Sequence, residues 1–210
     1  MYLTNRERVL KVLWKLITRP SQSPSYFHNL ITEKSPLALK LPWWSYDAIN
    51  FIRKLELNNS FEWGSGGSTL FLANISGQLT TIENDFAWYN KLQVELKENQ
   101  VDNVSLCKKD INLSSPENFK HSDYFNSLDK KYDLIAIDGE DHFGPDSSWS
   151  ARVECFEKAQ GFINPNGLII VDDSWRYPEI EKLSRASSNK KFESLGPARR
   201  GVTSTDIYFY

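Results

Sequence analysis

The sequence predicts an α/β protein built on a doubly wound, mostly parallel seven-stranded sheet with one antiparallel edge strand and an N-terminal helical extension. From residue 58 onward, short apolar runs alternate with segments whose apolar residues recur every three or four positions, as in βαβ units. The last two apolar runs are joined by a loop without a helical pattern, which indicates a hairpin and therefore the antiparallel strand. The 210 residues are 40% hydrophobic, which suits one sizeable core.

The elements of this sheet are assigned from the period of their apolar residues. The five parallel strands are expected at 60–63, 79–83, 104–108, 132–138 and 167–172, and the two closing strands at 192–195 and 205–210. Helices are expected at 68–75, 85–99, 147–162 and 177–187. The carboxyl ends of the parallel strands would then meet at one edge of the sheet.

The N-terminal part has a different pattern. Residues 6–18 place Val9, Leu10, Leu13, Leu16 and Ile17 on one side of an amphipathic helix, which we expect to cover a surface of the domain. Residues 20–42 contain four prolines and predict an irregular connector. Residues 43–55 then predict a second helix whose aromatic side packs in the core or contacts a ligand.

Composition and charge exclude several classes of protein. The chain carries 25 Lys+Arg against 27 Asp+Glu, so it has no basic field of the kind that binds a phosphate backbone, and we expect no nucleic-acid partner. The apolar stretch at 9–17 is interrupted by Lys11 and Lys15, which excludes a signal peptide or a membrane span. Cys107 and Cys155 lie far apart and predict no disulfide. We therefore expect a soluble, cytoplasmic protein without a membrane partner.

A glycine-rich turn lies between the first strand and the helix that follows it. Residues 61–69 read Phe-Glu-Trp-Gly-Ser-Gly-Gly-Ser-Thr, where the glycines let the backbone approach a ligand and the helix start offers free N–H groups. A dinucleotide fingerprint would require glycine at position 69, which is Thr69. The alternative pattern is an acid followed by spaced glycines: Glu62, Gly64 and Gly66, with Ser68 in the third glycine position. A purely structural turn is equally consistent with these residues.

Acidic residues follow the ends of the strands. Glu83 ends the second strand about 20 residues after the glycine turn, where a carboxylate can accept hydrogen bonds from ribose hydroxyls. Asp110, Asp138 and Asp172 follow the third, fourth and fifth strands. Each could be a loop or turn residue on its own. Together with Glu62 they predict a ligand crevice at one edge of the sheet.

From about residue 43 to the C-terminus, this pattern resembles the class I S-adenosylmethionine-dependent methyltransferases, which have a Rossmann-like fold. The segment 62–66 resembles the motif that lies beneath the methionine part of the cofactor, Glu83 the ribose-binding acid and Asp110 the residue beside the adenine. The resemblance implies a cofactor site made of Glu62, Gly64, Ser65, Gly66, Ser68, Glu83, Asp110 and Asp138. Trp63 or Trp88 could hold the sulfonium cation.

A narrower resemblance concerns the segments Ile-Ala-Ile-Asp-Gly-Glu-Asp-His at 135–142 and Gly-Leu-Ile-Ile-Val-Asp-Asp-Ser at 167–174. They look like the metal-assisted, catechol-type O-methyltransferases and related small-molecule or sugar methyltransferases. This implies that Asp138, Asp172 and Asp173 bind Mg²⁺, which would lower the pKa of a substrate hydroxyl, with His142 as general base. The family pattern is Asp-Gly-Asp-His, and here Glu140 intervenes. Acids at strand ends also occur in methyltransferases that use no metal.

The resemblance implies residues 1–45 as a helical extension and connector, and residues 46–210 as a domain that binds S-adenosylmethionine and methylates a small-molecule hydroxyl, with His142 and Asp138 as catalytic residues. Two alternatives remain: an NAD-dependent oxidoreductase, which the missing third glycine disfavours, and a noncatalytic binding or scaffold domain. Substrate preference would depend on residues 20–44 and 140–149. Arg199 and Arg200 could meet an anionic substrate or form a solvated hairpin tip. The aromatic-rich N-terminal part could join two copies of the chain.

Overall fold

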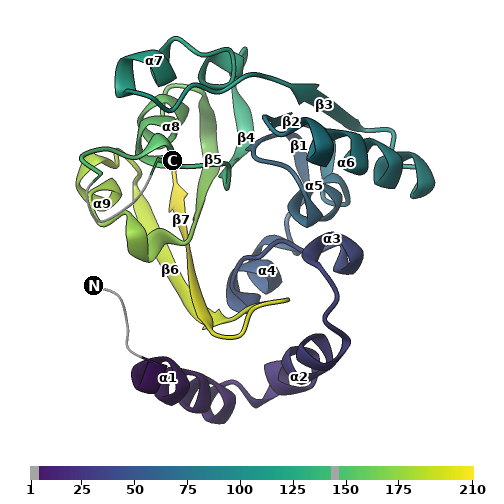
Figure 1. Ribbon diagram of the computed structural model, residues 1–210. Helices are drawn as coiled ribbons and strands as arrows, with labels where there is room; N and C mark the ends of the chain where they lie inside the picture. The colour runs from purple at the N-terminus through teal and green to yellow at the C-terminus, as the bar shows by residue number, and fades with distance from the viewer. Residues whose placement is uncertain (1–4, 143–146) are drawn as a thin grey trace.

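The computed structural model describes residues 5–142 and 147–210, and its seven strands form one sheet in the order β3-β2-β1-β4-β5-β7-β6 (Figure 1). The first five strands are parallel and β7 is antiparallel to both of its neighbours, as predicted. The strands are β1 (Leu57–Trp63), β2 (Ser76–Glu83), β3 (Val104–Lys108), β4 (Tyr132–Ile137), β5 (Ile163–Asp172), β6 (Ser188–Leu195) and β7 (Val202–Phe209).

Helices precede the sheet and connect its strands. They are α1 (Asn5–Thr18), α2 (Ser23–Thr32), α3 (Pro36–Leu39), α4 (Tyr46–Ile52), α5 (Gly67–Ala73), α6 (Phe86–Glu98), α7 (Pro116–Lys120), α8 (Ala151–Ala159) and α9 (Ile180–Leu183). Short 3-10 turns occur at η1 (Pro20–Gln22), η2 (Phe125–Ser127) and η3 (Ser174–Arg176).

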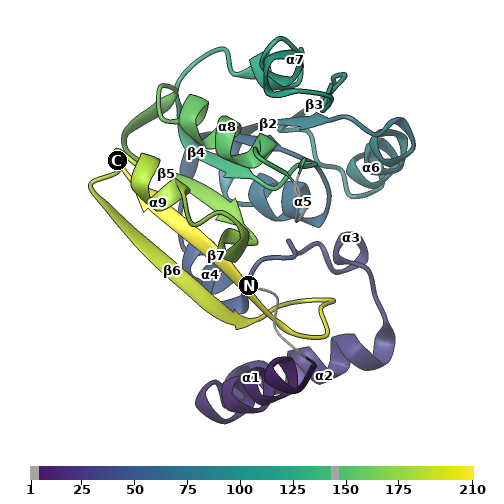
Figure 2. The ribbon, with the colours of Figure 1, turned by 60° about the vertical axis from the view of Figure 1, so that its left-hand side comes forward.

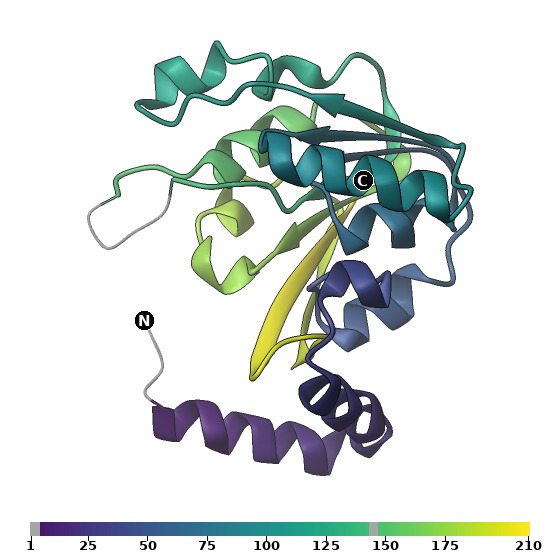
Figure 3. The ribbon, with the colours of Figure 1, turned by 45° about the vertical axis from the view of Figure 1, so that its right-hand side comes forward.

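The sheet has a core on each face. One face packs Phe61, Ile135 and Ile169 against α7 and α8, and the other packs Leu134 and Ile170 against α4 and α5. Figures 2 and 3 show these helices on opposite sides of the strands. Both faces are covered because a parallel strand buries its side chains in both directions. The carboxyl ends of the strands are left as the open edge.

The predicted connector at 20–42 is wrong, because this segment forms η1, α2 and α3. Three of its four prolines, Pro20, Pro24 and Pro36, stand at the first positions of these helices, where the missing N–H removes no helical hydrogen bond, instead of interrupting them. The helix predicted at 43–55 begins only at Tyr46, since the Ser45 side chain caps it by accepting the Ala48 amide. The helices predicted at 147–162 and 177–187 are likewise shorter, and Ser150 caps α8.

Helix α1 presents the opposite side to the domain from the one expected. Lys11 and Lys15 contact Glu193 of β6, at 3.0 and 3.4 Å, whereas Val9, Leu10, Leu13 and Ile17 of the predicted packing face each expose half or more of their surface. Among the predicted apolar residues, Leu16 is partly buried against the core. No helix in the described ranges is long and apolar enough to cross a bilayer.

Candidate functional site

The glycine turn after β1 is held by the buried carboxylate of Glu62. Its Oε2 accepts hydrogen bonds from the hydroxyls of Thr69, at 2.7 Å, and Thr81, at 2.9 Å. Thr69 Oγ1 in turn accepts the amide of Gly66 at 3.0 Å. The acid that precedes the turn therefore reaches the turn backbone through a threonine of α5.

The second oxygen of Glu62 has a different environment. Oε1 is buried and accepts no hydrogen bond from the described residues. Burial raises the pKa of Glu62 to about 7, although the nearby hydroxyls of Ser68, Thr69 and Thr81 oppose the shift. Ser68 is itself buried beside this carboxyl. A buried acceptor without a donor is costly, and a ligand N–H group would satisfy it.

Glu83, at the end of β2, holds the turn from the other side. Its Oε2 accepts the amide of Ser65 at 3.2 Å and the Ser65 hydroxyl at 2.6 Å, and Oε1 accepts the amides of Asn84 and Asp85, both at 2.8 Å. The Ser65 hydroxyl makes the same kind of contact with Glu83 that a ribose hydroxyl would make. The predicted residues Glu62, Ser65 and Glu83 are therefore brought together around one turn.

Close backbone packing joins this turn to the loop after β4. Gly64 has a φ of +86°, and a Cβ at this position would lie 2.6 Å from the Cα of Gly139. A Cβ on Gly139 would lie 1.9 Å from the hydroxyl oxygen of Tyr124, which is buried and has no hydrogen-bond partner in the described chain. Two glycines are therefore required where the carboxyl ends of β1 and β4 meet.

A cofactor could approach the turn at Gly66. A Cβ there would make only ordinary contacts, 3.7 and 3.8 Å from the Trp88 ring, and Trp88 Nε1 donates to the Ser65 carbonyl at 2.7 Å. Across the turn, Asn84 Nδ2 donates to Glu140 Oε2 at 2.6 Å, which links the loops that follow β2 and β4. Glu140, the additional acid in the predicted metal motif, thus connects the loop after β4 to the loop after β2.

Asp138, Asp172 and Asp173, the three acids predicted to bind a metal, lie close together, and we call them the acid row. Arginine side chains pair with all three. Arg199 Nη2 lies 2.9 Å from Asp172 Oδ2, and its Nη1 lies 2.9 Å from Asp173 Oδ1. Arg152 Nη2 lies 3.4 Å from Asp138 Oδ1, and Trp44 Nε1 donates to Asp138 Oδ2 at 3.3 Å.

These surroundings shift the three acids in different directions. Burial and the negative charge of Asp172 raise the pKa of Asp138 well above its usual value, against the effect of Arg152 and Arg199. Burial also raises the pKa of Asp172. Burial opposes the ionisation of Asp173, but Arg199 and Arg176 outweigh it, so the pKa of Asp173 lies below its usual value.

Mg²⁺ does not fit this arrangement. All six carboxylate oxygens of the row already face a donor: Thr205 and Arg199 for Asp172, Arg199, Thr203 and Arg176 for Asp173, Arg152 and Trp44 for Asp138. The described residues contain no group of three or more His, Cys, Asp or Glu side chains arranged to hold a metal ion. The guanidinium groups stand where the resemblance implies a cation.

Two predicted residues lie apart from the turn and the acid row. The side chain of Asp110 is 94% exposed and pairs with Lys108, whose charge and hydrogen bond lower the pKa of Asp110. His142 is exposed and stacks on Trp149 with ring centroids 4.9 Å apart. Trp63 is buried in the core and donates to the Tyr124 carbonyl, so it cannot face a sulfonium as suggested. Trp88 remains beside the turn.

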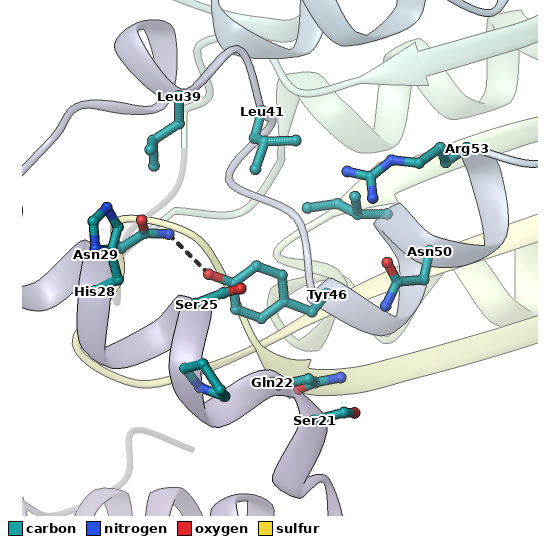
Figure 4. A pocket seen from close by; sticks show the side chains of 12 residues that line it. Ser21, Gln22, Ser25, His28, Asn29, Leu39, Leu41, Tyr46, Asn50 and Arg53 are labelled. Carbon is teal, nitrogen blue, oxygen red and sulfur yellow. Dashed lines mark hydrogen bonds between the residues drawn. The ribbon is translucent and has the colours of Figure 1, made fainter.

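Two clefts lie away from the glycine turn. One, of about 560 Å³, lies between α2 and α4 and contains a buried hydrogen bond from Asn29 Nδ2 to the Tyr46 hydroxyl at 2.9 Å (Figure 4). The other, of about 570 Å³, lies between α1 and the tip of the β6–β7 hairpin, and Asp173 is part of its wall. The second cleft therefore extends from the end of the acid row.

Sequence reasoning missed Arg152 and Tyr124. Arg152 Nε donates to the Gly139 carbonyl at 2.9 Å, Nη1 to the Asp172 carbonyl at 3.1 Å and Nη2 to the Asp138 carbonyl at 3.2 Å. It thereby ties the loops after β4 and β5 to α8. An arginine in the first turn of a helix, where acids are usual, was the available signal. Tyr124 lies in a loop without a periodic pattern and offered no signal.

Together, the sheet order and the glycine turn define the class I methyltransferase fold. An O-methyltransferase from Bacillus cereus in complex with SAH is 18% identical over 94% of this chain and 98% of its own, with a TM-score of 0.60. An N-methyltransferase from Bradyrhizobium japonicum is 12% identical over 78% and 92%, with a TM-score of 0.53. An rRNA methylase from Streptococcus thermophilus is 14% identical over 84% and 97%, also at 0.53.

No protein-family model matches the chain, and no curated protein matches its sequence. The structural neighbours act on oxygen, on nitrogen and on rRNA according to their names. They share the fold with this chain and differ from one another in acceptor. The predicted fold class is confirmed, and the fold alone does not identify the acceptor.

Proposed function

We propose that this protein is an S-adenosylmethionine-dependent methyltransferase that methylates a hydroxyl oxygen of a small molecule. The observation that carries the proposal is the glycine turn after β1, which is braced by Glu62 and Glu83 in a sheet of the methyltransferase order. S-adenosylmethionine supplies a methyl group on a positively charged sulfur. The chain has to bind that cofactor, orient the acceptor and accept a proton.

The residues around the turn suit the parts of this cofactor. Glu62 Oε1 is a buried acceptor to which none of the described residues donates, which matches an ammonium group. Glu83 now accepts the Ser65 hydroxyl, which a ribose hydroxyl would replace at equal hydrogen-bond count. Gly66 leaves the backbone open beside Trp88, so a ligand can come close. Gly64 and Ser68 complete the turn, and Asp138 directly follows β4, where its amide donates to the carbonyl of Trp63.

Asp110 would contact the adenine part of the cofactor. It is exposed just after β3, the strand whose Lys108 pairs with Glu83 of β2 in the sheet. Its role there would be to accept a hydrogen bond from the adenine amino group once Lys108 releases it.

Asp138 is the first candidate for the proton acceptor. Its pKa is raised by burial and by Asp172, so it is a stronger base than an exposed aspartate when it is ionised. His142 is the second candidate, because it follows Asp138 by four residues and an exposed imidazole nitrogen can accept a proton. Asp138→Asn should lower kcat at every pH, whereas His142→Gln should lower it without moving the pH profile if Asp138 is the base.

Titration calorimetry with S-adenosylhomocysteine tests the cofactor assignment. We expect saturable micromolar binding by the wild-type protein, unchanged by Mg²⁺, and no binding of NADH. Gly66→Ala should weaken the binding at least tenfold, because its methyl group occupies the approach to the turn while leaving the fold unstrained. Gly161→Ala, at the end of α8 and away from the turn, is the matched control and should bind like wild type.

The outcomes separate the three classes of function. A folded wild-type protein that binds no S-adenosylhomocysteine would overturn the proposal, and NADH binding in its place would favour the oxidoreductase. Binding of S-adenosylhomocysteine by a protein that methylates no offered hydroxyl compound would favour the noncatalytic domain.

A further inference from the structure

The cleft beside the acid row is strongly basic although the chain as a whole carries a charge of −2. We call it the basic cleft; α1, the segment after β5 and the tip of the β6–β7 hairpin form its walls. Figures 1 and 2 show the hairpin tip reaching toward α1 and α2. Its cationic side chains are Arg8, Lys11, Arg176, Arg199 and Arg200.

Fewer acids face these cations. Asp173 and Glu193 line the basic cleft, and Asp172 lies behind Asp173 as a second partner of Arg199. Among the described residues, the five cations of the cleft therefore meet these three carboxylates and Glu33, which lies beside Arg200, so the cleft has a positive surplus. A cleft lined by one sign of charge between low-dielectric walls concentrates ligands of the opposite sign.

The surplus belongs to two arginines on opposite walls. Among the described residues, Arg8 makes no ion pair, and it lies on the same side of α1 as Lys11, one turn away. Arg200 is 3.6 Å from Glu33, but their side chains are 87% and 77% exposed, so water screens the pair. The other cations are held by carboxylates of the domain.

The remaining wall suits an organic molecule. The exposed ring of Trp175 lies on this wall, with Arg176 5.3 Å from its centroid, and the hydroxyl-bearing residues Thr203 and Ser204 lie on β7. A flat apolar surface beside a cationic rim fits a compound that has both a carbon skeleton and an anionic group. The volume of about 570 Å³ lies in the range of small-molecule sites.

We propose that the basic cleft binds the anionic group, phosphate or carboxylate, of a small organic methyl acceptor. The inference rests on the proposed function, and it adds the chemical class of the acceptor. Arg8 and Arg200 recognise the anion, Trp175 contacts the carbon skeleton, and the acceptor hydroxyl faces the acid row that begins at Asp173. Arginine suits this role because its planar fork matches both phosphate and carboxylate oxygens.

Calorimetry with phenyl phosphate, benzoate and phenol tests the inference at low ionic strength. We expect phenyl phosphate or benzoate to bind, phenol not to bind, and added NaCl to weaken the anion. The double variant Arg8→Gln/Arg200→Gln should weaken the anion at least tenfold. The matched control Arg6→Gln/Arg185→Gln removes the same charge at exposed positions outside the cleft, and it should bind within twofold of wild type.

S-adenosylhomocysteine binding is measured on the same samples, so the two proposals fail separately. Absence of binding by both anions, or equal binding by wild type and the cleft variant, would overturn the inference even where S-adenosylhomocysteine binds. The small-molecule assignment would be overturned if a short RNA bound more tightly than phenyl phosphate and the cleft variant no longer bound that RNA. If the wild-type protein binds the anions but not S-adenosylhomocysteine, the proposed function is overturned and anion binding by the basic cleft is not.

Discussion

Glu62 makes the stability of the folded protein depend on pH. It is completely buried, its pKa is raised from 4.5 to about 7, and one of its oxygens has no donor among the described residues. Between these pH values the folded protein holds a proton that the unfolded chain releases. The contribution of this group to stability is therefore fully present below about pH 4.5 and is lost as the pH rises through 7.

Glu62→Gln should remove this pH dependence, because the amide imitates the protonated acid. At pH 8 we expect the variant to have a free energy of unfolding up to about 3 kcal/mol above that of wild type, with no difference at pH 4. Urea denaturation at both pH values measures it. Exposed Glu98→Gln is the control and should change stability by less than about 0.5 kcal/mol at either pH. A constant offset between Glu62→Gln and wild type would contradict the assignment.

The Tyr124 hydroxyl is buried beside Gly139. The hydroxyl has no partner in the described chain, so Tyr124→Phe should raise the free energy of unfolding by about 1 kcal/mol. Gly139→Ala would bring a methyl group to 1.9 Å from that oxygen and should cost at least about 2 kcal/mol. The double variant should recover part of this loss, because the ring carbon behind the hydroxyl is 3.1 Å away. Additive effects in the denaturation cycle would refute the contact.

At the scale of elements, Arg152 joins α8 to the ends of β4 and β5. Its guanidinium meets three backbone carbonyls and Asp138, with 12% of the side chain exposed. Arg152→Met should lower the free energy of unfolding by about 3–5 kcal/mol, since it leaves a buried carboxylate and carbonyls unpaired. Arg152→Met/Asp138→Asn should regain part of it. Chemical denaturation measures both, with exposed Arg185→Met as the control, and a loss below about 1 kcal/mol would show that the bridge is dispensable.

The same scale shows what could be predicted from the sequence. The strand Val104–Lys108 was predicted to the residue, because the apolar Val104 and Leu106 flank a polar residue between turns, as in a partly buried strand. The acids at the strand ends share one edge, which follows from parallel topology alone. Arg199 lies 27 residues after Asp172 on a hairpin tip, and its fold-back depends on tertiary contacts that have no local pattern. The acids of the site, which accept hydrogen bonds, were therefore partly predictable, and the arginine that donates to them was not.

At the scale of the whole molecule, α1 has two faces with different tasks. Lys11 and Lys15 pair with Glu193 of the domain, and Arg8 and Lys11 line the basic cleft, although lysines and arginines usually face solvent. The pattern of residues 6–18 predicted the helix correctly and its orientation incorrectly. Periodicity identifies an apolar face, but it does not say whether the same chain or another one covers that face.

The outward face of α1 is apolar and exposed. Val9, Leu10, Leu13, Trp14 and Ile17 each expose half or more of their surface. A group of exposed apolar side chains on one helix is typical of an interaction surface. A second copy presents the same self-complementary helix face, so we expect a twofold dimer through α1. Sedimentation velocity at micromolar concentration should give twice 24.3 kDa for wild type and 24.3 kDa for Leu13→Glu/Ile17→Glu. Val94→Glu, which places the charge on an equally exposed apolar residue of α6, should remain dimeric. A monomeric wild type would show that α1 does not join two copies, whereas a dimeric Leu13→Glu/Ile17→Glu variant would assign the interface to another surface.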